Sequence, residues 1–370
     1  MLAPESRLML TDALRPPPGT AVTAAVATTY SLDLVALLLA PMTFALHDDS
    51  VRDLERVDPI KLLESVRRHA EHTTVFTQAG RIHVPASYRR ILTFTEECTR
   101  EVRPPSAGRV FHPKAWVVRF DGPGLAPHHR VLCASRNLTF DRSWDTLLVL
   151  DEVAEGQGGP SLDGGPLARF LRELPALCVR PLPAARGDQV ELLAGGVANA
   201  RFALPDGFES GHFLPLGFPW SSPFPDLTCQ RALVVSPFLD VHTVRRLATT
   251  ADQAVLLSRP ESLDRVGQVP LGEAETYVLQ RAAEREVGED LDEAPAPGSS
   301  SDVPDGLHAK IWVLEDADEV TMVTGSANAT RAATGPEGNV ELDVVMVGRR
   351  AAVVPPRCGT GRRRAPACPG

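Results

Sequence analysis

The chain has 370 residues, 43% of them hydrophobic and 23% charged, which is ordinary for a globular protein that folds without disulfides or metals. Its formal net charge of −9 gives no general support for a basic nucleic-acid-binding face, although a local cleft can be basic on an acidic body. The six cysteines form no close CxxC pair, which argues against a zinc ribbon and against a disulfide-dense secreted scaffold.

The first half of the chain alternates predicted strands and helices. Residues 20–30 are small and β-branched and predict a buried strand, and an apolar helix over 31–40 follows, with Ser31 as its cap. Pro59 opens a second predicted helix, over 59–71. Further strands are predicted over 73–78, 110–120, 129–135 and 146–151, and a loop over 152–165.

The second half repeats this alternation after a stretch, 178–230, that is rich in Pro, Gly and Phe and whose weak periodicity gives no clear assignment. Strands are predicted over 232–240, 254–259, 307–316, 320–326 and 339–348, and helices over 241–248 and 271–286. Strands that alternate with helices indicate an α/β fold with mixed sheets.

These elements predict two pseudo-symmetric halves, each a mixed β-sheet flanked by helices. Residues 285–306 are acidic and rich in Pro, Gly and Ser and predict a mobile linker within the second half. The tail from Arg349 is Arg-rich, without acidic residues, and predicts disorder. The predicted parts are an N-terminal extension (1–18), the first half (19–177), a Pro/Gly-rich connector (178–230), the second half (231–348) and the tail (349–370).

Two segments of the chain carry the same polar residues in the same order. The first reads F-H-P-K-A-W-V-V from Phe111 and the second L-H-A-K-I-W-V-L from Leu307, and each leads into a strand ending in an S-x-N turn. Residues two apart in a strand share a face, so each His projects with its Lys. One such pair occurs by chance, but two copies with matching turns indicate a site. The repeated pairs are His112 and His308, Lys114 and Lys310, Ser135 and Ser326, Asn137 and Asn328, and then Asp145 and Glu341.

These residue types suit the cleavage of a phosphodiester. Two lysines and two Asn amides can stabilise charge on the non-bridging oxygens. One imidazole can attack phosphorus, and the other can protonate the departing oxygen and then activate water. Asp145 and Glu341 are candidates to fix the tautomer and orientation of the imidazoles. The sequence has no HExxH motif, clustered carboxylates or Cys/His ligand spacing, so we expect no metal and no cofactor.

The two H-x-K…S-x-N blocks resemble the phospholipase D superfamily, and their spacing leans toward its HKN-type members, the tyrosyl-DNA phosphodiesterase-like branch and related nucleases. The common family motif has an Asp after HxK and four residues; Arg119 and Glu315 stand there, and the phosphodiesterase branch lacks that Asp too. The first copy has Ala134 where the family favours Gly, and the second keeps Gly325. The resemblance implies two phospholipase D-like halves, His112 as nucleophile, His308 as general acid/base, a phosphohistidine intermediate and no metal requirement.

The predicted function is therefore a metal-independent phosphodiesterase, bacterial in type, with DNA or RNA as substrate and a role in repair or defence. A cytoplasmic location is expected, because the chain opens without a signal-peptide-like stretch and residues 34–46 are too short to cross a bilayer. Two alternatives stay open: a phospholipase or phosphatidyltransferase, which predicts an exposed apolar rim near the site, and a non-catalytic module that binds nucleic acid or protein. The sequence identifies no partner protein.

Several residues near the motifs have two interpretations each. Trp116 and Trp312 either pack in the core or stack on a base. Ser135 and Ser326 either donate to phosphate or shape the turn. Arg136 either reaches phosphate or lies in solvent. The remaining polar turn residues, Thr139 and Thr330, are expected to cap helices or turns, and His128 and His129 to lie on the surface.

Overall fold

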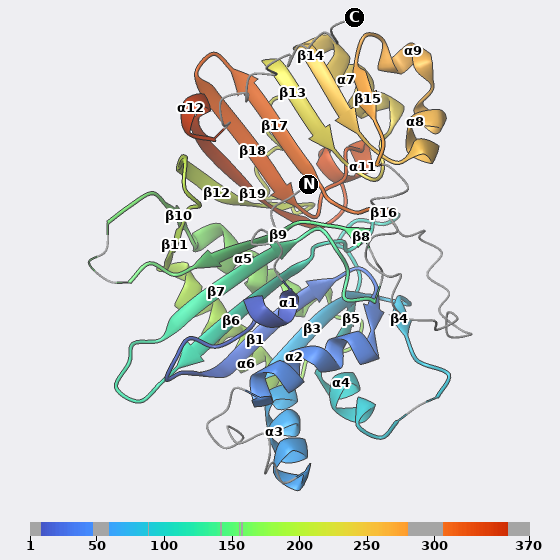
Figure 1. The fold of residues 1–370 in the computed structure, drawn as a ribbon. Coiled ribbons are helices and arrows are strands. Elements are labelled where there is room, and N and C mark those ends of the chain that lie inside the picture. The colour runs from blue at the N-terminus through green and yellow to red at the C-terminus, as the bar shows by residue number, and fades with distance from the viewer. Residues whose placement is uncertain are drawn as a thin grey trace, which may run out of the picture.

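The computed structural model describes residues 9–46, 59–87, 89–140, 143–154, 156, 158–279 and 306–353. Two large mixed sheets form two halves, the blue and green one below the yellow and red one in Figure 1. The predicted linker, apart from Gly306, and the tail after residue 353 lie outside the described residues. No helix in the described part of the chain has the length and apolar character to cross a membrane.

The first sheet has six strands, and its central strand is buried on both faces. This explains the unbroken run of small and β-branched residues in that strand. The strand order is β5 (Thr99–Val102), β3 (Thr73–Gln78), β1 (Ala21–Thr29), β6 (Ala115–Asp121), β7 (His128–Ala134) and β9 (Leu147–Asp151). Helices α2 (Leu34–Leu46), α3 (Pro59–Glu71) and α4 (Leu92–Cys98) cover one face, and α5 (Gly165–Glu173) and α6 (Ala184–Ala198) the other.

The second sheet has seven strands and shares a core with the first half. Its order is β12 (Phe208–Leu216), β19 (Glu341–Arg349), β18 (Glu319–Gly325), β17 (Ile311–Asp316), β13 (Cys229–Val235), β14 (Ala251–Leu257) and β15 (Glu275–Tyr277). One face carries α7 (Val241–Thr250), α8 (Pro260–Val266), α9 (Gln268–Leu271) and α11 (Arg331–Thr334). On the other face Phe213, Val344 and Met346 pack in one cluster with α5 and α6. The halves are therefore joined by an apolar core.

Six strands of each sheet share one topology, to which the second sheet adds β12 at its edge, and this confirms the predicted fold class. In each, three parallel strands are followed by three antiparallel ones: β1, β3, β5, β6, β7 and β9 correspond to β13, β14, β15, β17, β18 and β19. The starts of the halves also match, since Leu32 bridges Leu138 and Leu239 bridges Ala329. Short elements complete the fold: α1 (Leu10–Ala13), β2 (Leu32–Asp33), β4 (Ile82–His83), β8 (Ser143–Trp144), β10 (Ser161–Asp163), η4 (Leu174–Leu177), β11 (Arg201–Ala203), β16 (Gly306–Leu307) and α12 (Arg350–Val353).

Several predicted elements were wrong. The helix expected over 271–286 is instead the edge strand β15 in its described part, because Gly272 at φ +54 ends α9 and residues 275–277 pair with β14. The segment predicted as a connector holds α6 and also β12, which pairs with β19. Leu14, in the predicted N-terminal extension, is fully buried in the core of the first half. Asp33 rather than Ser31 caps α2, by accepting hydrogen bonds from the Val35 and Ala36 amides.

Candidate active site

Each H-x-K segment enters its strand along the boundary between the two halves. Phe111 bridges Val340 of the second half, and the His112 amide donates to the Val340 carbonyl at 2.8 Å. In the other copy β16 pairs with β8, and the His308 amide donates to the Trp144 carbonyl at 2.6 Å. Backbone hydrogen bonds to the opposite half thus place both histidines at the same boundary.

Two residues that the sequence analysis missed fix these segments from corresponding positions. Gln78, at the end of β3, accepts a hydrogen bond from the Phe111 amide at 2.7 Å. Arg259, just after β14, donates from Nε to the Leu307 carbonyl at 2.9 Å. Both residues lie at the end of the second strand of their half, and this shared position was the one signal in the sequence. Because Gln and Arg are different residue types, a search for repeated residues could not match them.

The S-x-N turns use their serine hydroxyls within the protein. Ser135 Oγ accepts from the Thr146 amide at 2.8 Å, and Ser326 Oγ accepts from the Leu342 amide at 3.0 Å. Both serines are fully buried. Of the two interpretations, the structure favours turn geometry, with an additional role for Ser326 described below.

The two lysines lie buried beside the histidines of their motifs. Lys114 Nζ donates to the His112 carbonyl at 2.7 Å, and Lys310 Nζ donates to the His308 carbonyl at 2.8 Å and to the Ser135 carbonyl at 3.0 Å. The last contact joins the second copy to the turn of the first. Burial lowers the pKa of Lys114 well below its usual value and that of Lys310 to about 8.

The imidazole of His112 is held by a carboxylate from the other half, as predicted for Glu341. His112 Nδ1 lies 3.0 and 2.9 Å from the two Glu341 oxygens, and Ser326 Oγ donates to Oε2 at 2.5 Å. The Tyr30 ring packs against the imidazole, with centroids 5.4 Å apart. When the Nδ1–H group donates a hydrogen bond to Glu341, Nε2 is unprotonated and carries the lone pair that a nucleophile needs.

The corresponding contact between Asp145 and His308 is not formed, and this part of the prediction needs correction. Asp145 Oδ2 lies 3.9 Å from Arg136 Nη1, and the second copy has Ala327 in place of that arginine. Neither ring nitrogen of His308 has a hydrogen-bond partner among the described residues. The two histidines therefore have different surroundings despite the repeat.

A second buried carboxylate, Asp343, was missed. It lies two residues after Glu341 on β19, is 1% exposed, and its Oδ1 accepts from the Ala327 amide at 3.0 Å. A Cβ on Gly325 would lie 2.5 Å from this oxygen, which explains glycine there at φ +151. The first copy has Leu147 opposite Ala134, so the repeat itself gave no reason to select Asp343.

Burial and the lysines dominate the electrostatics of the site. Burial first, then Lys114 and Lys310, lower the pKa of His112 well below its usual value. Burial, then Lys310 and Arg259, lower the pKa of His308 to about 2. Burial raises the pKa of both Glu341 and Asp343 to about 7. Because the lysines of both motifs act on both imidazoles, all four side chains lie within Coulombic reach of one another.

Several buried polar atoms at this boundary have no partner in the described part of the chain. They include Nδ1 and Nε2 of His308, the Oδ1 atoms of Asn137 and Asn328, and Oδ2 of Asp343. Buried polar atoms are nearly always hydrogen-bonded in native proteins. The oxygens of a phosphate ester are acceptors, so they could accept from a His308 N–H and from the Asn NH2 groups, whereas each Asn Oδ1 would need a donor such as a hydroxyl or water. The described residues contain no group of three or more His, Cys, Asp or Glu able to hold a metal.

The other residues considered from the sequence lie apart from this cluster. The rings of Trp116 and Trp312 are buried in the core, which favours the packing interpretation. Arg119 pairs with Asp121 at 2.9 Å, and Glu315 with Arg231 and Arg350. His129 is buried rather than on the surface, because Glu152 accepts from its Nδ1 at 2.7 Å. Thr330 caps α11, as expected.

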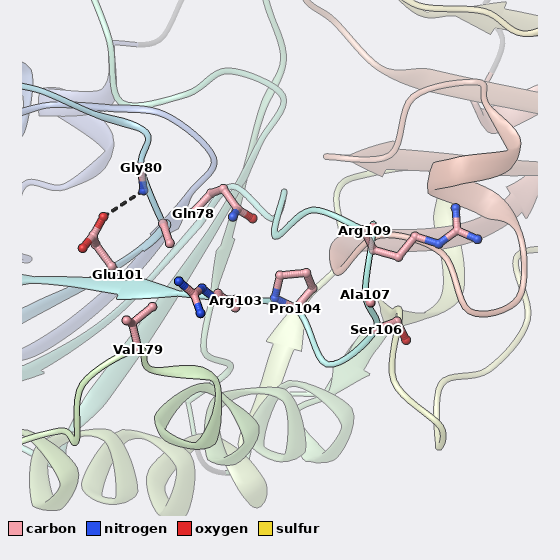
Figure 2. A pocket seen from close by; sticks show the side chains of 11 residues that line it. Gln78, Gly80, Glu101, Arg103, Pro104, Ser106, Ala107, Arg109 and Val179 are labelled. Atoms are coloured by element: carbon pink, nitrogen blue, oxygen red, sulfur yellow. Dashed lines mark hydrogen bonds between the residues drawn. The ribbon is translucent and has the colours of Figure 1, made fainter.

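Two cavities lie near the boundary. One, of about 340 Å³, includes Lys114 and Asn137 in its lining. The other, of about 480 Å³, lies beside the segment that leads to Phe111 and is lined by Gln78, Glu101 and Arg103 (Figure 2). In Figure 2 the Arg103 and Arg109 side chains point in different directions, and Glu101 accepts from the Gly80 amide at 2.8 Å. The second cavity therefore presents mixed charge.

Comparison with known proteins found likeness in solved structures alone. No family model matches the sequence, and no curated protein matches it. Yeast tyrosyl-DNA phosphodiesterase is similar at 11% identity over 95% of this chain and 87% of that chain, with a TM-score of 0.48. Polyphosphate kinase from Porphyromonas gingivalis is similar at 13% identity over 91% of this chain and 44% of that chain, with a TM-score of 0.42. At these identities the likeness concerns the fold.

Proposed function

We propose that this chain is a metal-independent phosphodiesterase that cleaves DNA or RNA through a phosphohistidine intermediate. The observation that carries the proposal is the meeting of both H-x-K segments at one boundary, with unpartnered polar atoms beside them. Two buried lysines supply the positive charge that metal ions supply in many phosphodiesterases. In this proposal the protein acts in the cytoplasm of a bacterium, in repair or in defence against foreign DNA.

In the first step, Nε2 of His112 attacks phosphorus while the bond from phosphorus to the leaving oxygen breaks. His308 gives its proton to that oxygen, so the leaving group departs as an alcohol. In the second step, His308 takes a proton from water, the water oxygen attacks phosphorus and the P–N bond breaks. The products are a free hydroxyl and a phosphate monoester, and both histidines return to their initial states.

The surroundings of the two histidines suit these different roles. A low pKa keeps His112 neutral and nucleophilic, and Glu341 holds its ring. His308 must gain a proton before the first step, although burial and Lys310 oppose this in the free protein. A bound phosphate anion would offset the lysine charges and raise the pKa of His308. Protonation of His308 is thereby linked to the arrival of substrate.

One observation favours a second candidate, a phospholipase or phosphatidyltransferase. Met9, Leu39 and Phe140 line the cavity that includes Lys114 and Asn137, and their side chains are exposed. An apolar rim beside the site is what a lipid-cleaving enzyme requires. The nature of the group that this rim contacts therefore decides between the two candidates.

The test is a panel of substrates in EDTA: bis(4-nitrophenyl) phosphate, single- and double-stranded DNA, RNA, a 3′-tyrosyl oligonucleotide and phosphatidylcholine vesicles. We expect cleavage of a nucleic-acid substrate in EDTA, abolished by His112→Ala. The matched control is His128→Ala, which removes a half-buried histidine paired with Asp151 away from the motifs. Activity that disappears in EDTA, or that His112→Ala leaves unchanged, contradicts the mechanism.

A further inference from the structure

The cavity of about 340 Å³ lies between the N-terminal segment, α2 and the turn after β7. Its buried lining includes Lys114, and Asn137 also contributes, so it adjoins the candidate site. Twelve of its lining residues are apolar, and the larger ones include Met9, Leu10, Leu39, Trp116, Leu138 and Phe140. A polar reaction site thus adjoins an apolar pocket.

The outer part of this pocket exposes large apolar side chains to water. Met9 is 66% exposed, Phe140 57% and Leu39 42%. Single exposed apolar residues are common, but several around one cavity beside a polar site mark a binding surface. An occupant with apolar faces would cover them.

The same pocket carries polar groups along one side. Arg136 Nη2 donates to the Thr139 carbonyl at 2.9 Å, and Arg136 Nη1 lies 3.9 Å from Asp145 Oδ2. Arg136, Thr139 and Asp145 all line the cavity. An acyl chain would remove water from these groups without replacing its hydrogen bonds, which is costly. A nucleobase has apolar faces and an edge of donors and acceptors, and so matches both sides.

The size of the cavity also favours a single ring system. Ligand pockets span roughly 300–1,000 Å³, and this one, at about 340 Å³, lies near the lower end. A phosphatidyl group with two long acyl chains needs a larger space or an open groove. We propose that the pocket binds the base of the nucleotide attached to the scissile phosphate. This inference rests on the proposed function and adds a subsite that anchors the substrate through its base.

The experiment compares two phosphodiesters with the same leaving group: thymidine 5′-(4-nitrophenyl) phosphate and its abasic counterpart, 2-deoxyribose 5-(4-nitrophenyl) phosphate. We expect kcat/KM for the thymidine ester to exceed that for the abasic ester by about tenfold or more, the range that base stacking provides. Leu39→Trp, which fills the pocket, and Phe140→Ala, which removes its exposed ring, should bring this ratio toward one. Leu192→Trp, at a similarly exposed leucine on α6, is the matched control and should keep the full ratio.

A binding measurement separates failure of the subsite from failure of the proposed function. Calorimetry should show that thymidine 5′-monophosphate binds more tightly than 2-deoxyribose 5-phosphate, and that Leu39→Trp removes the difference. If neither ester is hydrolysed but this difference is found, the proposed function fails and the subsite stands. Equal binding of the two monophosphates overturns the subsite. So does hydrolysis of phosphatidylcholine vesicles that Leu39→Trp abolishes, which would assign the pocket to an acyl chain.

Discussion

The two copies of the motif have the same backbone arrangement but different side-chain networks. In the first copy the histidine imidazole lies within 3.0 Å of both oxygens of Glu341, whereas the ring nitrogens of His308 have no hydrogen-bond partner among the described residues. In the last strand of each motif, β19 of the second copy has Asp343 where β9 of the first copy has Leu147. The copies thus share most positions, and the few positions that differ give the histidines different surroundings.

Under the proposed mechanism, this difference suits the two histidines to different tasks. A nucleophile must keep one tautomer and one orientation through both steps, which a fixed carboxylate provides. A general acid/base must gain and lose a proton in each cycle, and a ring that no carboxylate holds can adjust to substrate and water. The side-chain network therefore supports the assignment of His112 as nucleophile independently of the order of the motifs in the chain.

Replacement of the histidines should have the largest effect on activity, and the two variants should differ in whether a covalent adduct forms. We expect His112→Ala to lower kcat by at least about 10⁴-fold and to form no covalent species, because the nucleophile is missing. His308→Ala should still form the P–N bond when the leaving group is 4-nitrophenolate, which needs no proton, and should then hydrolyse slowly. Intact-protein mass spectrometry after mixing with thymidine 5′-(4-nitrophenyl) phosphate should show an adduct in His308→Ala alone. An adduct in His112→Ala would reverse the two roles.

Replacement of the corresponding carboxylates, Glu341 and Asp145, should lower kcat by a smaller factor, and by a different factor in each copy. Glu341→Gln removes the charged acceptor for His112 Nδ1 and should lower kcat by about 10²–10⁴-fold. Asp145→Asn, at the corresponding position, should change kcat by less than about fivefold, because Asp145 lies beside Arg136 rather than holding His308. Equal losses in the two variants would mean that substrate brings Asp145 to His308 and restores the symmetry.

The pH profile should reflect the same network. Glu341, with its pKa raised to about 7, is a carboxylate above that pH and loses its charge as pH falls through 7. Lys310, with its pKa lowered to about 8, is charged below that pH and loses its charge as pH rises through 8. We expect kcat/KM to peak between these values and to fall by about tenfold per pH unit on either side. Glu341→Gln should remove the acidic limb alone, and a profile that keeps this limb would assign it to another group.

The sequence predicted the repeated residues of the site well and the network around them only in part. Strands β3 and β9 and helix α3 lie within one residue of their predicted bounds, although Ile60 and Leu63 of α3 are exposed rather than packed on the sheet. Helix α6 was missed because its three glycines, Gly187, Gly195 and Gly196, weaken its helical pattern. Tertiary packing explains the glycine at position 196, because a Cβ there would lie 2.4 Å from His129 Nε2. Repeat matching found Glu341 through its partner Asp145, but Asp343 has leucine as its partner and could not be found that way.

The smallest effect is on stability and concerns Asp343. Burial raises its pKa from 3.8 to about 7, so its protonated form stabilises the fold at low pH, and this contribution is lost as pH rises through 7. Asp343→Asn removes the charge and keeps an oxygen to accept from the Ala327 amide, so we expect Tm at pH 8 to rise by about 2–4 °C. Asp343→Leu, which gives the second copy the residue of the first, leaves that amide without an acceptor and should lower Tm relative to Asp343→Asn. Calorimetric scans at pH 5 and pH 8 measure both changes. A lower Tm of Asp343→Asn at pH 8 would contradict this expectation. It would mean that the ionised Asp343 carboxylate stabilises the fold by pairing with the lysines, an interaction that Leu147 cannot make in the first copy.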